Sequence, residues 1–337
     1  GTVLNTPLVK APILSKDLNS EIYLKEDNLQ LTGSFKIRGA FNKLAMMDDK
    51  RRKNGVVAAS AGNHAQGLAY AAQHFGCEAT IFMPEATPLT KVSGVKSYGA
   101  NVVLVGENFD EAYATATKSA LDNDKEFIHP FADDAVIAGQ GTIALEILEK
   151  IEDIEHIIVP IGGGGLISGI AIAAKAINPN IKITGVVASG ARGMKDSFEA
   201  RMPIDSASVK TIADGIAVRD VTPKLLDIIL EYVDEIVEVT DNETANAILF
   251  LLEKHKLMVE GAGAVATAAL MHGKVDIENS KVCAIVSGGN IDVTMLSLII
   301  EKGLVKSNRK MNLIVTLMDK PGALMLLTEV FTKSSAN

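Results

Sequence analysis

Short apolar runs alternate with longer amphipathic stretches along most of the chain, and this order is typical of parallel β-α-β units. In the first part of the chain we expect one sheet of four short parallel strands, at residues 21–25, 56–59, 79–83 and 102–105. Helices are predicted at residues 40–47, 64–75, 89–98 and 110–123. The third of them has Thr87 as its N-cap and Pro88 at its first position.

The chain turns at His129, Pro130 and Phe131, and a second group of alternating elements follows. Its strands are expected at residues 156–161, 182–187, 235–239 and 282–286. Its helices are expected at residues 135–151, 166–177, 223–230 and 293–301, with two more beginning near Glu243 and Gly263. The segment 189–209 between them is more polar and less regular. Two such groups in 337 residues predict an α/β protein with two domains.

The last part of the chain is organised differently. After a polar connector at residues 306–310 we expect a strand at 312–318, a turn at 319–322 and an apolar helix at 323–331. A single strand, turn and helix is too short to bury a core of its own. We therefore expect this module either to be unfinished or to pack against something else.

Composition narrows the class of protein. Hydrophobic residues make up 47% of the chain and charged residues 22%, which is typical of a globular protein with a sizeable core. The net charge is −8 and basic residues are not clustered, which argues against a nucleic-acid partner. Cys77 and Cys283 are too far apart in sequence for a CxxC metal pair. No signal peptide or membrane-spanning run is visible, so we expect a cytoplasmic location.

A lone lysine, Lys36, lies in the stretch LTGSFKIRGA, where a turn meets an apolar helical run. If its amine is buried, its pKa falls, and the neutral amine can form a Schiff base with an aldehyde such as pyridoxal phosphate. A solvated lysine at the start of a helix is the alternative. An aldehyde cofactor would also need a phosphate cradle, ring contacts and a carboxylate site elsewhere in the chain.

A run of four glycines follows an apolar strand and leads into an apolar helix. These residues are Gly162, Gly163, Gly164 and Gly165, and Leu166 comes directly after them. Successive N–H groups at a helix N-terminus suit a phosphate, whereas a simple tight turn, the alternative, needs only one or two glycines. The run fits neither G-x-G-x-x-G nor a Walker A loop, so a phosphate monoester is the ligand that remains.

Two further turns follow predicted strands. The first consists of Ser60, Ala61, Gly62, Asn63 and His64. Its amides and the Ser60 hydroxyl suit a carboxylate, and the Asn63 amide suits a ring hydroxyl. Helix capping and a structural role for His64 are the alternatives. The second turn begins with Ser287, which either meets a pyridine nitrogen or caps the next helix. In a parallel sheet all these turns lie at one edge.

In this order, SFKIRGA, SAGNHAQG, GGGGL and SGGN resemble the motifs of the pyridoxal-phosphate enzymes of fold type II, and closely those of threonine dehydratases. The likeness covers nearly all of residues 1–303. It implies the two open parallel-sheet domains of the tryptophan synthase β-like fold. Residues 1–29 and 135–303 would form a large cofactor-binding domain, residues 30–134 a small substrate-loop domain, and residues 304–337 a linker and partial regulatory module.

The resemblance also implies the roles of individual residues. Lys36 would bind the cofactor as a Schiff base, with Phe35 near the ring, Asn63 at the ring hydroxyl and Ser287 at the ring nitrogen. The glycine run with Leu166 would hold the phosphate, and the turn from Ser60 to His64 would hold the substrate carboxylate. A hydroxyl at the ring nitrogen, in place of a carboxylate, favours β-elimination over reactions that need a long-lived carbanion.

The implied reaction is a deamination. Lys36 would remove the Cα proton of L-threonine or L-serine, the β-hydroxyl would leave as water, and hydrolysis would release a 2-oxo acid and ammonia. Serine racemases of this fold usually carry a serine where this chain has Ala61, so a second proton donor is missing here. Cation-binding members tend to carry acids where Val187 and Gly193 stand, so we expect no such metal site.

The tail sequence LIVTLMDKPGALMLL resembles the opening strand and helix of an ACT domain, an amino-acid-sensing module of threonine dehydratases. A partial module suggests a partner subunit, so we expect a homo-oligomer under amino-acid or nucleotide control. The effector and the choice between a biosynthetic and a catabolic role stay open. Two other functions also stay open: a serine racemase or serine-preferring dehydratase, and a catalytically silent amino-acid-binding regulator.

Overall fold

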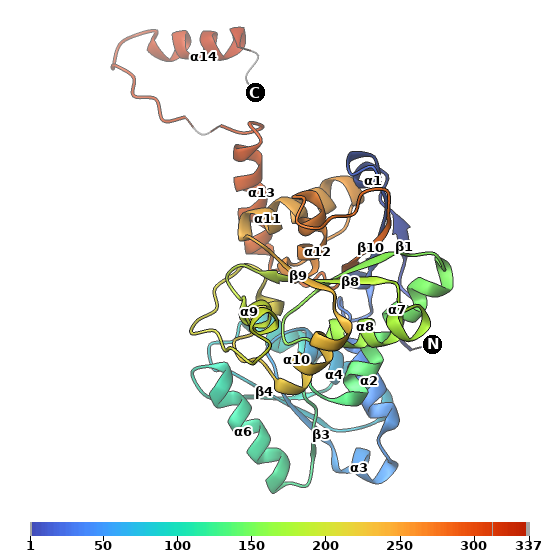
Figure 1. Cartoon of the computed structure of the whole chain (residues 1–337). Coiled ribbons are helices and arrows are strands. Elements are labelled where there is room, and N and C mark those ends of the chain that lie inside the picture. The colour runs from blue at the N-terminus through green and yellow to red at the C-terminus, as the bar shows by residue number, and fades with distance from the viewer. Residues whose placement is uncertain (1, 312, 335–337) are drawn as a thin grey trace.

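The computed structural model describes residues 2–311 and 313–334 and contains two β-sheets covered by helices (Figure 1). The larger sheet has the order β1 (Leu8–Lys10), β2 (Glu21–Glu26), β10 (Lys281–Val286), β7 (His156–Pro160), β8 (Lys182–Ala188) and β9 (Glu235–Val239). The smaller sheet has the order β5 (Asn101–Leu104), β4 (Ala79–Met83), β3 (Val56–Ala59) and β6 (Glu126–Phe127). All neighbouring strands are parallel except β1, which pairs antiparallel with β2. The predicted α/β class with two parallel-sheet units is confirmed.

Helices cover both faces of the larger sheet because its strands are apolar on both sides. Ile158 and Ala284 face the cluster formed with α1 (Pro12–Asp17), α11 (Asp241–Phe250), α12 (Gly261–Met271) and α13 (Val293–Lys306). Ile157 and Cys283 face the opposite cluster, formed with α7 (Asp134–Lys150), α8 (Gly165–Ile177), α9 (Gly193–Ala200) and α10 (Pro223–Tyr232). A π-helical turn, Leu251–His255, extends α11.

The smaller sheet is covered in the same way. Its strands pack on one face against α2 (Lys36–Met46), α4 (Asn63–Phe75) and α5 (Leu89–Lys96). On the other face they pack against α6 (Phe109–Asp122). The short helix α3 (Asp49–Asn54) leads into β3, with Asp48 as its N-cap.

Several predicted elements differ from the structure. The strand expected at residues 21–25 does not belong to the smaller sheet, because β2 pairs with β10 and β1 in the larger one. The fourth strand of the smaller sheet is β6, which has only two residues and no clear sequence signal. Pro88 is the N-cap of α5, so the expected cap by Thr87 is wrong. Helix α2 begins at Lys36 rather than at residue 40, and α9 lies in the segment expected to be irregular.

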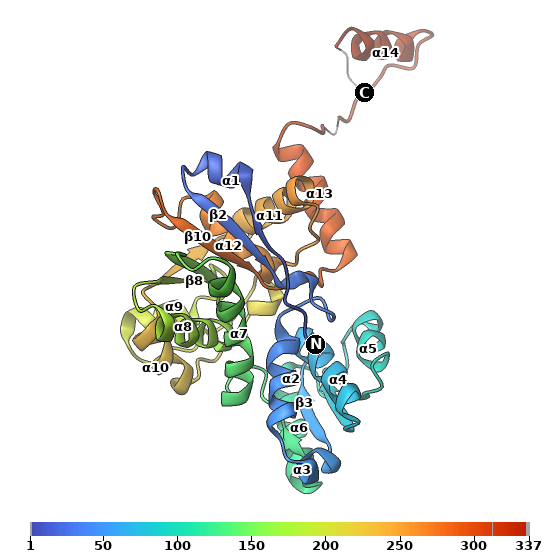
Figure 2. The same ribbon diagram turned by 90° about the vertical axis from the view of Figure 1, so that its right-hand side faces the viewer.

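The tail forms only half of the expected module. Helix α14 (Ala323–Lys333) is present as predicted, but residues 313–318 form no strand, and Asn312 lies outside the described residues. Both views show α14 apart from the two sheets (Figure 1 and Figure 2). Ile314 is 100% exposed, so among the described residues it has no neighbour to complete the backbone hydrogen bonds that a strand would require.

Three helices meet at glycines. A Cβ atom on Gly139 of α7 would lie 2.5 Å from the carbonyl oxygen of Arg38 in α2. A Cβ atom on Gly169 of α8 would lie 2.3 Å from the carbonyl oxygen of Ile137 in α7. Real Cβ atoms do not approach backbone oxygen this closely, so both helix crossings depend on glycine. As a result α2, α7 and α8 are held in fixed positions relative to one another.

A buried ionic network fastens α2 to the larger sheet. Arg38 donates to Asp27 at 2.6 Å and to Glu146 of α7 at 2.6 Å, and Lys25 of β2 donates to Glu146 at 2.5 Å. The side chains of Arg38, Asp27 and Lys25 are at most 1% exposed. Breaking one partner of a buried pair leaves an uncompensated charge, which typically costs about 3–5 kcal/mol. The network therefore ties β2, α2 and α7 together.

We expect Gly169→Ala to lower the free energy of unfolding by about 1–3 kcal/mol, because the added methyl group meets backbone rather than a flexible side chain. The matched control is Gly94→Ala, also within a helix, where the nearest atom would be Gln66 Nε2 at 4.0 Å. That change should stabilise the protein by about 0.4–1 kcal/mol. Urea unfolding of both variants measures the difference, and equal effects would contradict the proposed contact.

Candidate active site

Lys36 is the first residue of α2, and its side chain is half-buried. The amine Nζ donates a hydrogen bond to the carbonyl oxygen of Pro130 at 2.9 Å. It lies 5.3 Å from the centre of the Phe35 ring and 6.0 Å from that of Phe131. Burial lowers the pKa of Lys36 to about 8, although the negative charge of Glu260 opposes the shift. A substantial fraction of the amine is therefore neutral near pH 8 and able to act as a nucleophile or base.

The glycine run lies between β7 and the start of α8, as predicted. Within the described chain, the backbone amides of residues 162–166 donate no hydrogen bond. A Cβ atom on Gly163 would lie 2.7 Å from the Phe131 ring, and one on Gly165 would lie 2.7 Å from the Phe131 carbonyl oxygen. Gly164 has φ +95°, which favours glycine. The turn is thus packed tightly by Phe131 and leaves a set of free donors at a helix N-terminus, which suits a phosphate.

The turn from Ser60 to His64 follows β3 and begins α4. The hydroxyl oxygen of Ser60 accepts a hydrogen bond from the amide of Gly62 at 3.2 Å. The His64 ring is buried and its Nε2 donates to the carbonyl oxygen of Ile128 at 3.0 Å. Burial, with the nearby charge of Lys36, lowers the pKa of His64 to about 3. The imidazole is therefore neutral at physiological pH.

Ser287 comes directly after β10 and is buried. Its hydroxyl donates to the carbonyl oxygen of Ala262 at 3.3 Å, and its own carbonyl oxygen accepts from the amide of Phe35 at 3.0 Å. The amide of Gly289 donates to the carbonyl oxygen of Gly33 at 2.8 Å. The backbone of the SGGN turn is therefore hydrogen-bonded to the backbone of the turn that precedes Lys36.

These contacts bring together the four turns that the sequence singled out. Phe131 links Lys36 to the glycine run, and the backbone of Ser287 meets that of Phe35. Asn63 reaches the SGGN turn, since its Oδ1 accepts a hydrogen bond from Asn290 at 2.8 Å. The helices α2, α4 and α8 all begin here, so their positive N-terminal ends favour a ligand with negative charges.

Glu260, which is only 5% exposed, is a site residue that the sequence analysis did not predict. Its Oε1 accepts a hydrogen bond from Asn63 Nδ2 at 2.7 Å. Burial and the nearby Asp214 raise the pKa of Glu260 to about 7, partly offset by Asn63, Lys91 and Lys36. The available signal was a single acid before the apolar, glycine- and alanine-rich helix α12, which is unusual at a buried position.

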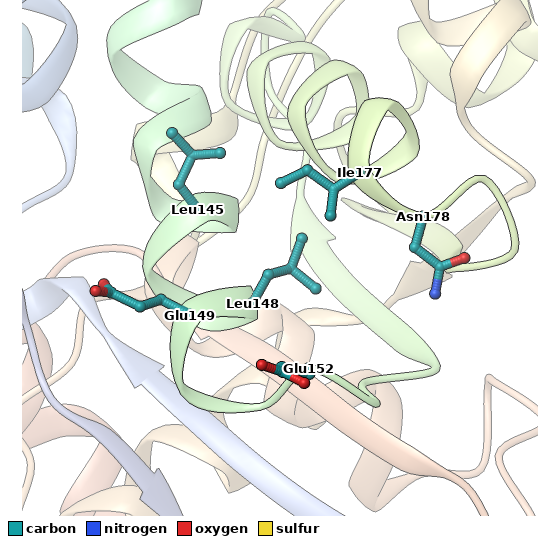
Figure 3. A pocket seen from close by; sticks show the side chains of 6 residues that line it. All are labelled: Leu145, Leu148, Glu149, Glu152, Ile177 and Asn178. Atoms are coloured by element: carbon teal, nitrogen blue, oxygen red, sulfur yellow. The ribbon is translucent and has the colours of Figure 1, made fainter.

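A separate cavity lies away from Lys36. A cavity of about 660 Å³ lies beside the C-terminal ends of α7 and α8, where Leu148 and Ile177 line it together with Glu152 (Figure 3). Because the glycine run lies at the other end of α8, this cavity does not belong to the same site.

Val187 is buried in β8 and Gly193 begins α9. Among the helices described, none is long and apolar enough to cross a membrane.

The sequence matches a known protein family over most of its length. Residues 1–288 match the model of the family described as pyridoxal-phosphate dependent enzyme. This match spans most of the chain, includes the turns at Lys36, Ser60 and the glycine run, and ends within the SGGN turn. The chain therefore belongs to the pyridoxal-phosphate dependent enzymes.

Several individual proteins of known name are similar to this chain in sequence or in structure. The chain is 49% identical to an L-threonine ammonia-lyase of Thermotoga maritima, over 100% of this chain and 84% of the relative. It is 45% identical to a catabolic L-threonine dehydratase of Staphylococcus aureus, over 90% of this chain and 88% of the relative. Among solved structures, the processed form of threonine deaminase isoform 2 from Solanum lycopersicum has a TM-score of 0.85 and 38% identity, covering 89% of this chain and 83% of that one. Maize serine racemase has a TM-score of 0.84 and 35% identity, covering 91% and 94%.

The low pKa of His64 predicts acid sensitivity. Between its ordinary value of 6.5 and about 3, the unfolded chain binds a proton that the folded chain does not, so stability falls as the pH decreases. We expect His64→Gln to reduce the slope of unfolding free energy against pH by about 1.4 kcal/mol per pH unit in this range. Urea unfolding at several acidic pH values measures the slope. The control His74→Gln removes an exposed histidine of the same helix, and an equal effect there would refute the prediction.

Proposed function

We propose that this protein is a threonine ammonia-lyase that converts L-threonine, and also L-serine, to a 2-oxo acid and ammonia. The observation that carries the proposal is Lys36, a half-buried lysine whose amine has a pKa of about 8 and lies beside the free amides of the glycine run. The family match supports pyridoxal phosphate as the cofactor, and the names of the sequence relatives support threonine as a substrate.

The residues present suit this cofactor. Lys36 would bind it covalently, and the amides of Gly162, Gly163, Gly164, Gly165 and Leu166 would hold its phosphate. Phe35 would pack near the ring, Asn63 would donate to the ring hydroxyl, and Ser287 would meet the ring nitrogen. The free amides and the absence of room for any Cβ atom at Gly163 and Gly165 support the phosphate assignment in particular.

When bound, pyridoxal phosphate serves as an electron sink that acidifies the Cα–H bond of an attached amino acid. Lys36 would take this proton, because its lowered pKa of about 8 leaves a minority of the amine neutral near physiological pH, far more than for an ordinary lysine. The carbonyl oxygen of Pro130 holds the free amine in place at 2.9 Å. The substrate carboxylate would bind to the Ser60 hydroxyl and to the amides of Ala61, Gly62, Asn63 and His64.

A serine racemase is the second candidate, because maize serine racemase shares the fold over 91% of this chain. Racemisation needs a proton donor on the face of the substrate opposite the base. Ala61 has no such group, which favours elimination for this chain. A catalytically silent regulator is disfavoured because Lys36, Asn63, the glycine run and Ser287 are all retained.

The organisation of the chain is part of the proposal. We assign residues 1–29 and 135–303 to a large cofactor-binding domain and residues 30–134 to a small domain, in accord with the two sheets. Residues 304–337 would be a linker and the start of an ACT-like regulatory module, and the Thermotoga relative aligns over this region too. A homo-oligomer, a cytoplasmic location and the absence of a divalent-cation site remain predictions.

We expect Lys36→Ala to reduce the formation of 2-oxobutanoate from L-threonine by more than about 10³-fold, since both the covalent attachment and the base are lost. Lys36→Arg, which keeps the charge, should be equally inactive. Lys50→Ala, at an exposed position in α3, is the control and should retain the wild-type rate. A coupled assay for 2-oxobutanoate gives the rates, and an active Lys36→Ala enzyme would refute the proposal.

Ala61→Ser should introduce racemisation. The added hydroxyl would supply the missing proton donor, so we expect D-serine to form from L-serine at a rate at least about tenfold above that of the wild type. Chiral chromatography after incubation measures the product. Appreciable D-serine from the wild-type protein would instead favour the racemase.

A further inference from the structure

Glu260 lies at the N-cap of α12, where it contacts the SGGN turn on its backbone side. Its amide donates to the carbonyl oxygen of Gly288 at 3.1 Å. A Cβ atom on Gly288 would lie only 2.2 Å from Glu260 Oε1. The carboxyl group is therefore packed directly against the turn that follows Ser287, and glycine at position 288 makes room for it.

The amide of Asn63 is held from both ends. Its Nδ2 donates to Glu260 at 2.7 Å, and its Oδ1 accepts from Asn290 Nδ2 at 2.8 Å. Asn290 Nδ2 also donates to the carbonyl oxygen of Thr32 at 2.8 Å, four residues before Lys36. Because the amide nitrogen only donates and the carboxylate only accepts, this pattern permits a single orientation of Asn63.

One N–H group of Asn63 remains available in this orientation. Asparagine carries two N–H groups on Nδ2, and Glu260 uses one of them. If the carboxyl group were absent, only Asn290 would hold the side chain, and Nδ2 would lose its fixed direction. The orientation of the free N–H group therefore depends on Glu260.

Charged groups from three other elements act on Glu260. Asp214 raises its pKa, whereas Lys91 of α5 and Lys36 of α2 lower it, and burial is the largest influence. With a pKa of about 7, the carboxyl group gains its charge as the pH rises through neutrality. A charged acceptor strengthens the hydrogen bond from Asn63, so the restraint on Asn63 is stronger above this pH than below it.

We propose that Glu260 is a positioning residue for the cofactor hydroxyl: it fixes the amide of Asn63 so that the remaining N–H group is free to donate to that hydroxyl. This inference rests on the proposed function, which assigns Asn63 to the ring hydroxyl. Glu260 itself has no contact with the reacting atoms in this role. It differs in this from Lys36, which acts on substrate directly.

The test compares two ligands of the cofactor-free protein, pyridoxal phosphate and its analogue that lacks the ring hydroxyl. The dissociation constant of the analogue divided by that of pyridoxal phosphate reports the hydroxyl contact, because this ratio is high when the contact is made. Intrinsic differences between the two ligands cancel when variants are compared. We expect Asn63→Ala and Glu260→Ala each to reduce this ratio by about five- to tenfold, the amount expected for one lost hydrogen bond. The double variant should show no further reduction, because both changes remove the same contact.

The Glu260→Gln variant distinguishes a loss of the orientation of Asn63 from a loss of the folded structure. Its amide oxygen can still accept from Asn63, so the ratio should stay within about twofold of wild type near neutral pH. In the wild type the ratio should rise as the pH increases through about 7, and in Glu260→Gln it should be flat. The matched control is Asp214→Asn, which removes a neighbouring acid without touching Asn63 and should keep the high ratio. Circular dichroism verifies that each variant is folded.

Three outcomes would overturn the inference: an unchanged ratio in Glu260→Ala, additive losses in the double variant, or a ratio insensitive to Asn63→Ala. The last would also remove Asn63 from the ring hydroxyl. Failure of the proposed function is recognised separately, because the wild-type protein would then form no 2-oxobutanoate from L-threonine.

Discussion

The close approach of α2, α7 and α8 determines where the chemistry takes place. Gly139 and Gly169 allow the three helices to touch backbone to backbone, so the starts of α2 and α8 cannot drift apart without losing packed contacts. Lys36 opens the first of these helices and the glycine run opens the last. The distance between a reactive amine and an anion-binding turn is therefore set by helix packing rather than by the loops themselves.

The buried charges of Arg38, Asp27 and Glu146 complement this packing. Taking these groups out of water is unfavourable, and the hydrogen bonds among them offset that cost only while the geometry is kept. A hydrophobic replacement would be compatible with stability but would not fix the rotation of α2. We interpret the network as a means of holding the direction of Lys36 rather than as a major source of stability.

Much of the site could be predicted from the sequence because its signals are local. An apolar strand followed by four glycines, or by a short polar turn, indicates both the element and its end, and the order of elements indicates the parallel sheets. Residues 21–25 were predicted in the wrong sheet, since their partner β10 is near the other end of the core. Glu260 could not be predicted for the same reason. It contacts Asn63, 197 residues away, and isolated acids have no characteristic spacing. The tail strand was predicted from its apolar pattern, yet a strand also needs a partner for its backbone.

The free amides of the glycine turn affect how the protein behaves once its cofactor has dissociated. Phe131 packs against Gly163 and Gly165, so the turn keeps its shape and continues to present unpaired donors. If this turn holds the cofactor phosphate as proposed, inorganic phosphate and sulfate would fit the same position, because they carry the same tetrahedral arrangement of oxygen atoms. On that assignment, buffer anions would compete with the cofactor for the turn, and the rate of reloading would depend on the salt in which the empty protein is stored.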